Sequence, residues 1–354
     1  MNKKQQEFDS IMRKEIFEEP NVVKSLLYKH ISQNGNIDIE LPEKIDNIVI
    51  VASGSSYNCA AIAAPLFIEF AHIPCVCEYS SEFVLQKKHF ITQNSLYIFV
   101  SQSGETSDTT NALKMIKEHN VKTMCITNAQ NSTMWNLCDY KILSDAGEEK
   151  SIASTKALTA QILCAILVIL KIKSRKKSDI SGYINTMSRL PEYLDLIIDD
   201  FETIKNAAKL VAEYNNICIL GNKNYYPIAK EGALKIKETC YLNVMAYPFG
   251  EFLHGHVAVL NQKSLVIAII DEENCEFATR NLQKIRKDYN PKIVCITSVE
   301  SANEGDINIY IKTKRKLKAI FGSLLTLQLL ACELASILDK NPDSPKGLSK
   351  VVKD

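Results

Sequence analysis

Short apolar runs rich in β-branched residues alternate along this chain with longer segments of helical periodicity. The first series of runs reads DNIVIVAS, IPCVCEY, SLYIFVS, VKTMCITN and DYKILSD, and the second reads NNICILG, LNVMAY, SLVIAII, PKIVCITS and INIYIK. Strands that alternate with helices are typical of parallel sheets covered by helices, so the pattern predicts an α/β fold.

The two series match each other in order. SLYIFV corresponds to SLVIAI, KTMCIT to KIVCIT, and SSEF (80–83) to FGEF (249–252). We therefore predict a duplicated α/β domain, each copy closed by a long apolar helix, around 155–173 and 318–340. The predicted parts are an N-terminal helical lead (1–45), a first domain (46–177), connecting helices interrupted by Pro191 (178–214), a second domain (215–340) and a C-terminal tail (341–354).

Composition excludes several classes of partner. Lys+Arg number 42 and Asp+Glu 41, so no net field attracts nucleic acid or an acidic membrane surface. The longest apolar run, ILCAILVIL (162–170), is too short to span a bilayer and is predicted to be a buried helix. The 11 cysteines are scattered without zinc-site spacing, and the start MNKKQQEFDS lacks a signal core. A cytoplasmic protein with reduced thiols and no metal is expected.

A hydroxyl-rich loop, SQSGETSDT, follows the strand run SLYIFV. Ser101, Ser103 and Thr106 offer hydroxyl donors, and Gly104 allows a close backbone approach to an anion. Ser and Thr at helix starts usually only cap the helix, and for one such loop alone capping is the better explanation. The first half has two more such loops, SGSSYN (53–58) and SIAST (151–155), and three together favour an anion site.

The duplication provides an internal comparison for these loops. In the second half SLVIAII runs into DEEN, and the loop after the first strand reads GNKNYY, without serines. If the hydroxyls only capped helices, both copies should keep them, so the asymmetry predicts one anion site, in the first half. Neither loop carries a G-x-G-x-x-G or G-x-x-x-x-G-K-[ST] motif, which leaves a small phosphorylated metabolite as the expected ligand.

Charged residues in the second half suggest proton transfer. Glu231, Lys235 and Glu238 are spaced to share one helix face, although for this segment alone an ion pair on a solvated face is the better explanation. The loop GEFLHGH then brings His254 and His256, and imidazole is the side chain most readily tuned to transfer protons near neutrality. Together these groups could supply a general acid and base.

Seven ordered motifs carry a resemblance to a known family. They are KEIFEEP (14–20), ASGSSYN (52–58), SQSGET (101–106), ASTKALTAQ (153–161), YPIAKEGALKIKE (226–238), GEFLHG (250–255) and DSPKGLSK (343–350). With them the chain resembles the double sugar-isomerase (SIS) domain family, close to the isomerase half of glucosamine-6-phosphate synthase. The resemblance implies two tandem SIS domains, each a flavodoxin-like three-layer sandwich.

The same resemblance implies roles for individual residues. It assigns the phosphate of a hexose 6-phosphate to Ser55, Ser56, Ser101, Gln102, Ser103 and Thr106, and sugar contacts to Glu149, Ile152 and Ser154. It makes Glu238 the base that moves a proton between C1 and C2, with Glu231 and Lys235 beside it. It implies that His254 assists ring opening across a homodimer interface and that Lys350 acts near the sugar oxygens. No cofactor is expected.

Two departures leave the substrate open. The chain starts Met1-Asn2-Lys3, without the N-terminal Cys of the synthase's glutaminase, so we expect it not to make ammonia from glutamine by that route. His256 replaces the family's usual Pro, and its role stays open. The leading hypothesis is a deaminase that converts glucosamine-6-phosphate to fructose-6-phosphate and ammonia. Alternatives are a fructosamine-6-phosphate deglycase of the fructoselysine type and a non-catalytic sugar-phosphate sensor, which the absence of a DNA-binding basic lead disfavours.

Overall fold

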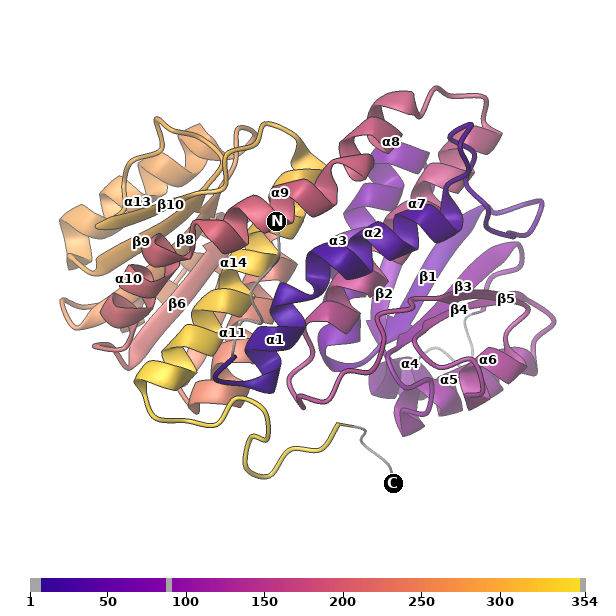
Figure 1. Cartoon of the computed structure of the whole chain (residues 1–354), viewed down its shortest axis with the longest axis horizontal. Helices are drawn as coiled ribbons and strands as arrows, with labels where there is room; N and C mark the ends of the chain where they lie inside the picture. The colour runs from indigo at the N-terminus through magenta and orange to yellow at the C-terminus, as the bar shows by residue number, and fades with distance from the viewer. Residues whose placement is uncertain (1–7, 87–90, 351–354) are drawn as a thin grey trace. The chain divides into compact units, whose positions relative to one another are not determined.

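The computed structural model describes residues 8–86 and 91–350, and it forms two five-stranded parallel sheets (Figure 1). The strand order is β2-β1-β3-β4-β5 in the first sheet and β10-β9-β8-β6-β7 in the second. Given from its other edge, the second order is β7-β6-β8-β9-β10, so the two copies arrange their strands in the same way. The strands are β1 (Asn47–Ala52), β2 (Cys75–Tyr79), β3 (Ser95–Ser101), β4 (Lys122–Thr127), β5 (Tyr140–Leu143), β6 (Asn216–Gly221), β7 (Val244–Pro248), β8 (Ser264–Ile270), β9 (Lys292–Thr297) and β10 (Ile307–Tyr310). Each predicted strand run therefore forms a strand.

Helices fill the intervals between the strands. They are α1 (Ile11–Phe17), α2 (Glu19–His30), α3 (Gly54–Leu66), α4 (Ser80–Gln86), α5 (Ser107–Lys117), α6 (Thr133–Leu137), α7 (Lys156–Arg175), α8 (Ser181–Ser188), α9 (Leu190–Asp199), α10 (Phe201–Val211), α11 (Tyr225–Cys240), α12 (Phe249–Phe252), α13 (Cys275–Tyr289) and α14 (Lys316–Ile337). The connecting segment is thus helical, as its periodicity predicts, and Pro191 lies in the first turn of α9, where its missing N–H costs no helical hydrogen bond.

Contacts divide the described chain into two compact units. The first-sheet unit holds 21–86, 91–147 and 157–191, and the second-sheet unit holds 8–20, 148–156 and 192–350. The linear partition that the sequence predicts is coarser than this, because residues 8–20 and 148–156 belong with the second sheet although they precede it by many residues. Those two segments add side chains such as Glu15 and Glu149 to the second-sheet unit from outside its own α/β repeat.

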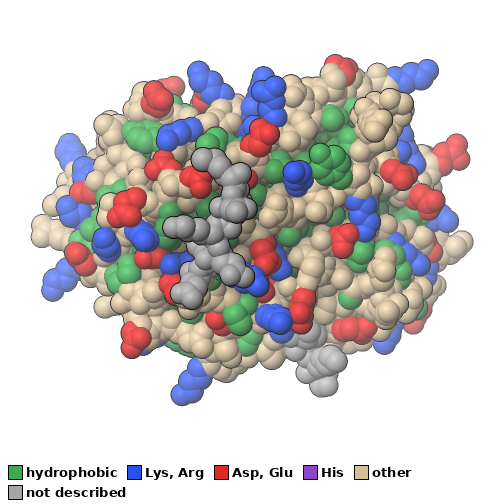
Figure 2. Space-filling model, in the orientation of Figure 1, with side chains coloured by type: hydrophobic (Ala, Val, Ile, Leu, Met, Phe, Trp, Pro, Cys, Tyr) green, Lys and Arg blue, Asp and Glu red, His purple; other side chains and the backbone are tan. Residues whose placement is uncertain are grey.

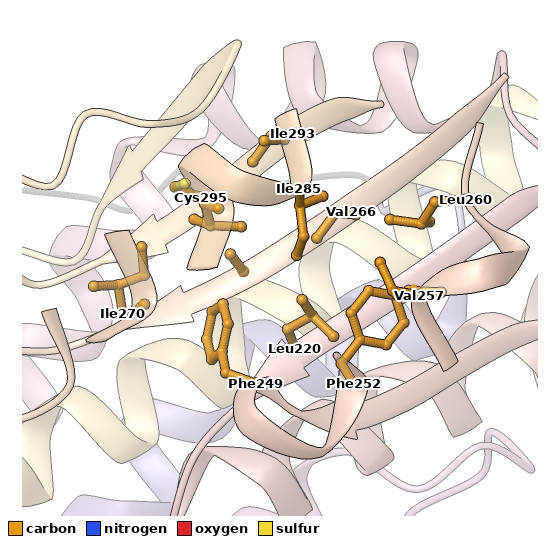
Figure 3. Close-up of a cluster of buried hydrophobic side chains, with 14 of the residues drawn as sticks. Leu220, Phe249, Phe252, Val257, Leu260, Val266, Ile270, Ile285, Ile293 and Cys295 are labelled. Atoms are coloured by element: carbon orange, nitrogen blue, oxygen red, sulfur yellow. The ribbon is translucent and has the colours of Figure 1, made fainter. Parts of the chain in front are cut away.

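The hydrophobic pattern explains which strands are central. All seven residues of β3 and of β8 are buried, as expected for strands covered on both faces, whereas the edge strands β2 and β7 are mostly half-buried or exposed. In the second sheet, side chains of α12 and α13 pack with inward residues of β6, β8 and β9 (Figure 3). Phe249, Phe252, Val266 and Ile285 lie at the centre of this layer, and Cys295 packs there as an apolar residue.

The long apolar helices are core elements. By length and composition, α7 and α14 would be able to cross a membrane, but 83% of the most apolar window of each is buried within the structure, as in core helices of globular domains. The predicted buried helix at 162–170 is confirmed as part of α7. On the face seen in Figure 2, acidic and basic side chains are interspersed, in keeping with a net charge of +1.

Candidate functional site

The first sheet has a topological switch point between β1 and β3. The chain leaves β1 towards β2 on one side and later returns to β3 on the other, and Ala52 at the end of β1 pairs with Val100 near the end of β3. In open parallel sheets, ligands bind beyond the carboxyl ends of the strands at such a point. The two loops there are SGSSYN and SQSGET, so the topology places both hydroxyl-rich loops at one edge of the sheet.

Hydroxyls of the second loop hold its shape and do not cap the helix that follows. Ser101 Oγ lies 2.9 Å from Thr106 Oγ1 and accepts the N–H of Gly104 at 3.1 Å, while Ser103 Oγ accepts the N–H of Glu105 at 3.1 Å. Thr106 is the N-cap residue of α5, but its side chain makes no capping hydrogen bond. The capping explanation therefore fails for Thr106, and the positive end of α5 remains directed at the loop.

The carboxylate of this loop is turned to another helix. Glu105 accepts the backbone N–H of Thr133 at 2.7 Å and its hydroxyl at 2.9 Å, at the start of α6. This pairing gives the negative charge a partner outside the loop. In the neighbouring loop Ser53 is the N-cap of α3 without a capping bond, and Ser56 Oγ donates to Gln161 Oε1 of α7 at 3.1 Å.

The equivalent switch point of the second sheet is closed by its own side chains. The N–H of Asp271 donates to Asn274 Oδ1 and the N–H of Asn274 donates to Asp271 Oδ1, each at 3.0 Å. Glu273 is paired with Lys223 at 2.8 Å. Burial raises the pKa of Asp271. The loop after β8 therefore carries acidic side chains where the loop after β3 carries hydroxyls.

A second group of predicted residues meets in the loop 148–155 of the second-sheet unit. Glu149 Oε2 lies 2.5 Å from Lys350 Nζ and accepts the Ser154 hydroxyl at 3.0 Å, and its other oxygen accepts the N–H of Thr155 at 2.9 Å. Lys350 also donates to the carbonyl of Ser151 at 2.7 Å. The tail and the loop thus form one ammonium and carboxylate pair, with the carboxylate side chain fully buried.

The tail is also tied to the loop through its backbone. The N–H of Ile152 donates to the carbonyl of Asp343 at 3.0 Å. The carboxylate of Asp343 in turn accepts the N–H groups of Ile11 and Met12, at 2.9 and 2.7 Å, at the start of α1. The resemblance assigns Ile152 a backbone contact with the sugar, and its N–H is already engaged by the tail.

Helix α11 carries three predicted catalytic residues on a buried face. Lys235 Nζ lies 2.6 Å from Glu238 and 3.4 Å from Glu231. The side chains of Glu231 and Lys235 are 0% and 1% exposed, and that of Glu238 is 22% exposed. The expectation of an ion pair on a solvated face is therefore wrong about the face, because the side chains of Glu231 and Lys235 are buried. Helix α14 packs closely on α11 at Gly232, where a Cβ would meet Leu327 at 2.8 Å.

The ion pair on α11 fixes the protonation state of its lysine. Burial alone would lower the pKa of Lys235, but the carboxylates of Glu231 and Glu238 outweigh burial and raise it. The carboxylate of Glu149 also raises the pKa of Lys235, so the loop 148–155 lies within electrostatic range of α11. Lys235 is thus favoured as an ammonium, and of its two carboxylate partners only Glu238 is partly exposed.

The two histidines of GEFLHGH are exposed. Within the described residues, the side chain of His254 forms no hydrogen bond or ion pair with the α11 carboxylates, so the structure does not bring it to Glu238. Gly255 has φ +111°, a conformation that favours glycine and turns the chain between the two histidines. His256 stacks on the ring of Tyr247 with centroids 4.3 Å apart, which gives it a packing partner that the sequence did not suggest.

Several residues that hold this site were not predicted from the sequence. Glu15 of α1 accepts backbone N–H groups of the 148–155 loop, Asp343 joins the tail to α1, and Gln161 pairs with Ser56. Burial raises the pKa of Glu15 while its N–H donors lower it, and the net direction is upward. Glu15, Asp343 and Gln161 all lie inside motifs that carry the family resemblance, which was the available signal.

Comparison with known proteins agrees with this architecture. The SIS domain family model matches residues 43–171 and 210–338. Glutamine–fructose-6-phosphate aminotransferase (isomerizing) of Buchnera aphidicola is 32% identical over 98% of this chain, and that of Escherichia coli K12 is 31% identical over 96%. The chain spans 58% of the length of these relatives.

Solved structures give the same result. The C-terminal domain of glucosamine-fructose-6-phosphate aminotransferase from Francisella tularensis superposes with a TM-score of 0.88 at 29% identity, covering 97% of this chain and all of that one. Glucosamine-6-phosphate deaminase from Thermotoga maritima has a TM-score of 0.79 at 21% identity, covering 97% and 99%, and shares the fold. The names of these proteins are those of enzymes that act on hexose 6-phosphates. The chain belongs to the SIS domain family, has two SIS domains and is homologous to the isomerase half of glutamine–fructose-6-phosphate aminotransferase.

Proposed function

We propose that this protein is a phosphosugar isomerase of the aminotransferase's isomerase-domain type, and that it converts glucosamine-6-phosphate to fructose-6-phosphate and ammonia. The relatives' names support an amino-sugar or ketose 6-phosphate as substrate, and a deaminase of that substrate shares the fold. The observation that carries the proposal is Glu238, a partly exposed carboxylate held by a buried ammonium on α11.

The chemistry needs one group that moves a proton between adjacent carbons. In the open-chain amino aldose, Glu238 would take the proton from C2 and return it to C1, while a second proton passes from the amine nitrogen to O1, so that the C1 aldehyde becomes a hydroxymethyl group and the C2 amine becomes an imine. Water then adds to the imine and ammonia leaves, which gives the ketose. No electron is gained or lost overall, so the balance needs only water.

The lysine between two carboxylates suits this cycle. When Glu238 is protonated it loses its charge, and Lys235 would be left buried without a counter-ion if Glu231 were absent. Glu231 keeps the ammonium paired in both protonation states of Glu238, which avoids the large cost of an isolated buried charge. The arrangement lets the base change its charge without disturbing the rest of the helix face.

Other predicted residues would bind and polarise the sugar. Lys350 and Ser154, which both hydrogen-bond to Glu149, would face the sugar oxygens, where an ammonium stabilises developing negative charge. Ser55, Ser56, Ser101, Gln102, Ser103 and Thr106 would hold the 6-phosphate at the helix starts of the first sheet. His254, exposed in one chain, would assist ring opening from the second chain of a homodimer.

Ammonia release tests the proposal. Purified protein is incubated with glucosamine-6-phosphate, and ammonia and fructose-6-phosphate are measured in separate coupled assays. Equal yields of the two products above a no-enzyme control are expected. Fructoselysine-6-phosphate is run in parallel, and turnover of it alone would replace the deaminase with a deglycase. No turnover of either would overturn the proposal.

Glu238→Gln separates an enzyme from a sensor. The amide keeps the shape but cannot carry a proton, so we expect turnover to fall at least about 1,000-fold with binding of sugar phosphate retained, measured by calorimetry. Glu251→Gln is the matched control, because it makes the same change at an exposed position of α12. If Glu238→Gln turns over as fast as wild type, Glu238 is not the base.

A further inference from the structure

We infer that Glu15 of α1 is a positioning residue whose carboxylate holds the 148–155 loop so that Glu149 and Ser154 meet Lys350. The inference rests on the proposed function for its kinetic consequence only. The geometry itself lies wholly within the second-sheet unit. It starts from a carboxylate that is 3% exposed and has no cation as its direct partner among the hydrogen bonds and ion pairs of the described residues.

The partners of Glu15 are backbone groups. Oε1 accepts the N–H of Lys150 at 2.5 Å, and Ser151 N–H lies 3.4 and 3.3 Å from the two oxygens. Two adjacent N–H groups that converge on one carboxylate form charge-assisted hydrogen bonds, which are stronger than those to a neutral acceptor. A buried carboxylate with such partners defines the path of the loop at residues 150 and 151.

The residues on either side of this clamp are those assigned to the sugar. Glu149 precedes it and pairs with Ser154 and Lys350, and the carbonyl of Ser151 accepts from the same Lys350. A peptide that turned at residue 150 would move the carboxylate of Glu149 and the carbonyl of Ser151 together. Both partners of the Lys350 ammonium therefore depend on where Glu15 holds the backbone.

Helix α1 holds Glu15 in a fixed position because the helix itself is anchored by packing and by an ion pair. Met12 and Ile16 of α1 are fully buried, and Arg13 forms an ion pair with Glu333 of α14. Helix α14 also packs along α11, so α1 and α11 both pack against α14 (Figure 1). Glu15 thus connects the loop 148–155, which carries Glu149, to the packed helices α1, α14 and α11, the last of which carries Glu238.

Glu15→Gln tests the inference with little change of shape. A Gln oxygen can still accept one N–H, but its NH₂ group would face the other donor, so the clamp is reduced from two acceptors to one. We expect kcat to fall about 10- to 100-fold, with the affinity for inorganic phosphate within about twofold of wild type, because the predicted phosphate loops lie in the other unit. Lys14→Gln, an exposed neighbour on the same helix, is the control and should keep wild-type kcat.

Hydrogen exchange gives a readout that does not depend on activity. In Glu15→Gln the segment 148–155 should exchange at least about tenfold faster than in wild type, while α1 and α11 keep their protection. Faster exchange across all three segments would show a general structural role and overturn the inference, as would unchanged exchange with unchanged kcat. If wild type turns over no sugar phosphate, the proposed function fails, and exchange of the loop alone still decides the role of Glu15.

Discussion

Gly104 is where the predicted phosphate loop is most sensitive to a single methyl group. It has φ +65°, and a Cβ built on it would lie 2.2 Å from Ser132 Oγ, 2.6 Å from Ser132 Cβ and 2.9 Å from Thr127 Oγ1. Ser132 cannot move freely, because its hydroxyl donates to the carbonyl of Ala129 at 2.8 Å and accepts the N–H of Trp135 at 3.3 Å at the start of α6. Gly104→Ala must therefore displace the loop or break the cap.

Gly54 provides a matched comparison in the neighbouring loop. It has a similar backbone conformation, φ +57°, but a Cβ there would meet nothing within 4 Å. Gly54→Ala therefore costs only the left-handed strain, roughly 1–2 kcal/mol, less about 0.4–1 kcal/mol from the stiffer unfolded chain. Gly104→Ala adds an overpacking cost of about 1–3 kcal/mol, so we expect it to destabilise by about 1–4.6 kcal/mol against about 0–1.6 kcal/mol for Gly54→Ala.

Urea unfolding of wild type and both variants measures this difference directly. The midpoint of the first transition that involves the first-sheet unit should drop further for Gly104→Ala than for Gly54→Ala, with unchanged slope. Binding of inorganic phosphate, measured by calorimetry, should weaken at least about tenfold in Gly104→Ala. Gly35→Ala, at φ +74° with nothing near its Cβ, controls for left-handed strain away from both loops. Equal destabilisation by Gly104→Ala and Gly54→Ala would refute the packing argument.

Two further predictions concern buried and half-buried charges. Lys235→Met should destabilise the protein by about 3–5 kcal/mol, because it leaves Glu231 buried without its cation, and adding Glu231→Gln should recover part of the loss; urea unfolding that shows no recovery would contradict this. Burial alone would raise the pKa of Asp139, but hydrogen bonds from Lys117 and Thr123 lower it, so its stabilising effect is present above about pH 4 and disappears as pH falls through the lowered folded pKa. The stability gap between wild type and Asp139→Asn should therefore be largest at neutral pH and close in acid, and a gap that widens in acid would exclude this reasoning.

The periodicity of the chain was sufficient to predict the sheets. Each strand run is short, β-branched and bounded by helix, and central runs such as SLYIFV and SLVIAII lack polar positions because both their faces are covered. The strand order did not follow from periodicity. The structure supplies it, and the order is the same in both copies.

The burial of the α11 face was not predictable from local pattern. Glu231, Lys235 and Glu238 have the spacing of an exposed salt-bridged helix, and only tertiary packing, to which α14 contributes along α11, makes the face of Glu231 and Lys235 interior. The role of Glu15 was hidden for a related reason. Its partners are backbone N–H groups 135 and 136 residues away, and backbone groups leave no signature in a sequence.

The duplicated sheet offers a physical way to separate residues that build the fold from those that serve a ligand. Asp139 precedes β5 and accepts the N–H of Thr123 at 2.9 Å, and Asp306 precedes β10 and accepts the N–H of Ile293 at 2.9 Å. Thr123 and Ile293 occupy the second position of β4 and of β9, so each aspartate ties the same two strands in its own copy.

These aspartates show what a requirement of the fold looks like. Each carboxylate accepts the backbone N–H of the second residue of the neighbouring strand, β4 or β9. Each also forms an ion pair with a lysine, Lys117 at 2.7 Å in one copy and Lys292 at 2.8 Å in the other. The loops after β3 and β8 differ by the same test, since Ser101 occupies the position of Ile270, and the residues that follow are Gln102 and Ser103 in one copy and Asp271 and Glu272 in the other. A strand end that both copies build alike but furnish with different chemistry is under a demand other than folding, and binding of an anion by the hydroxyl loop of the first copy is the demand that we propose.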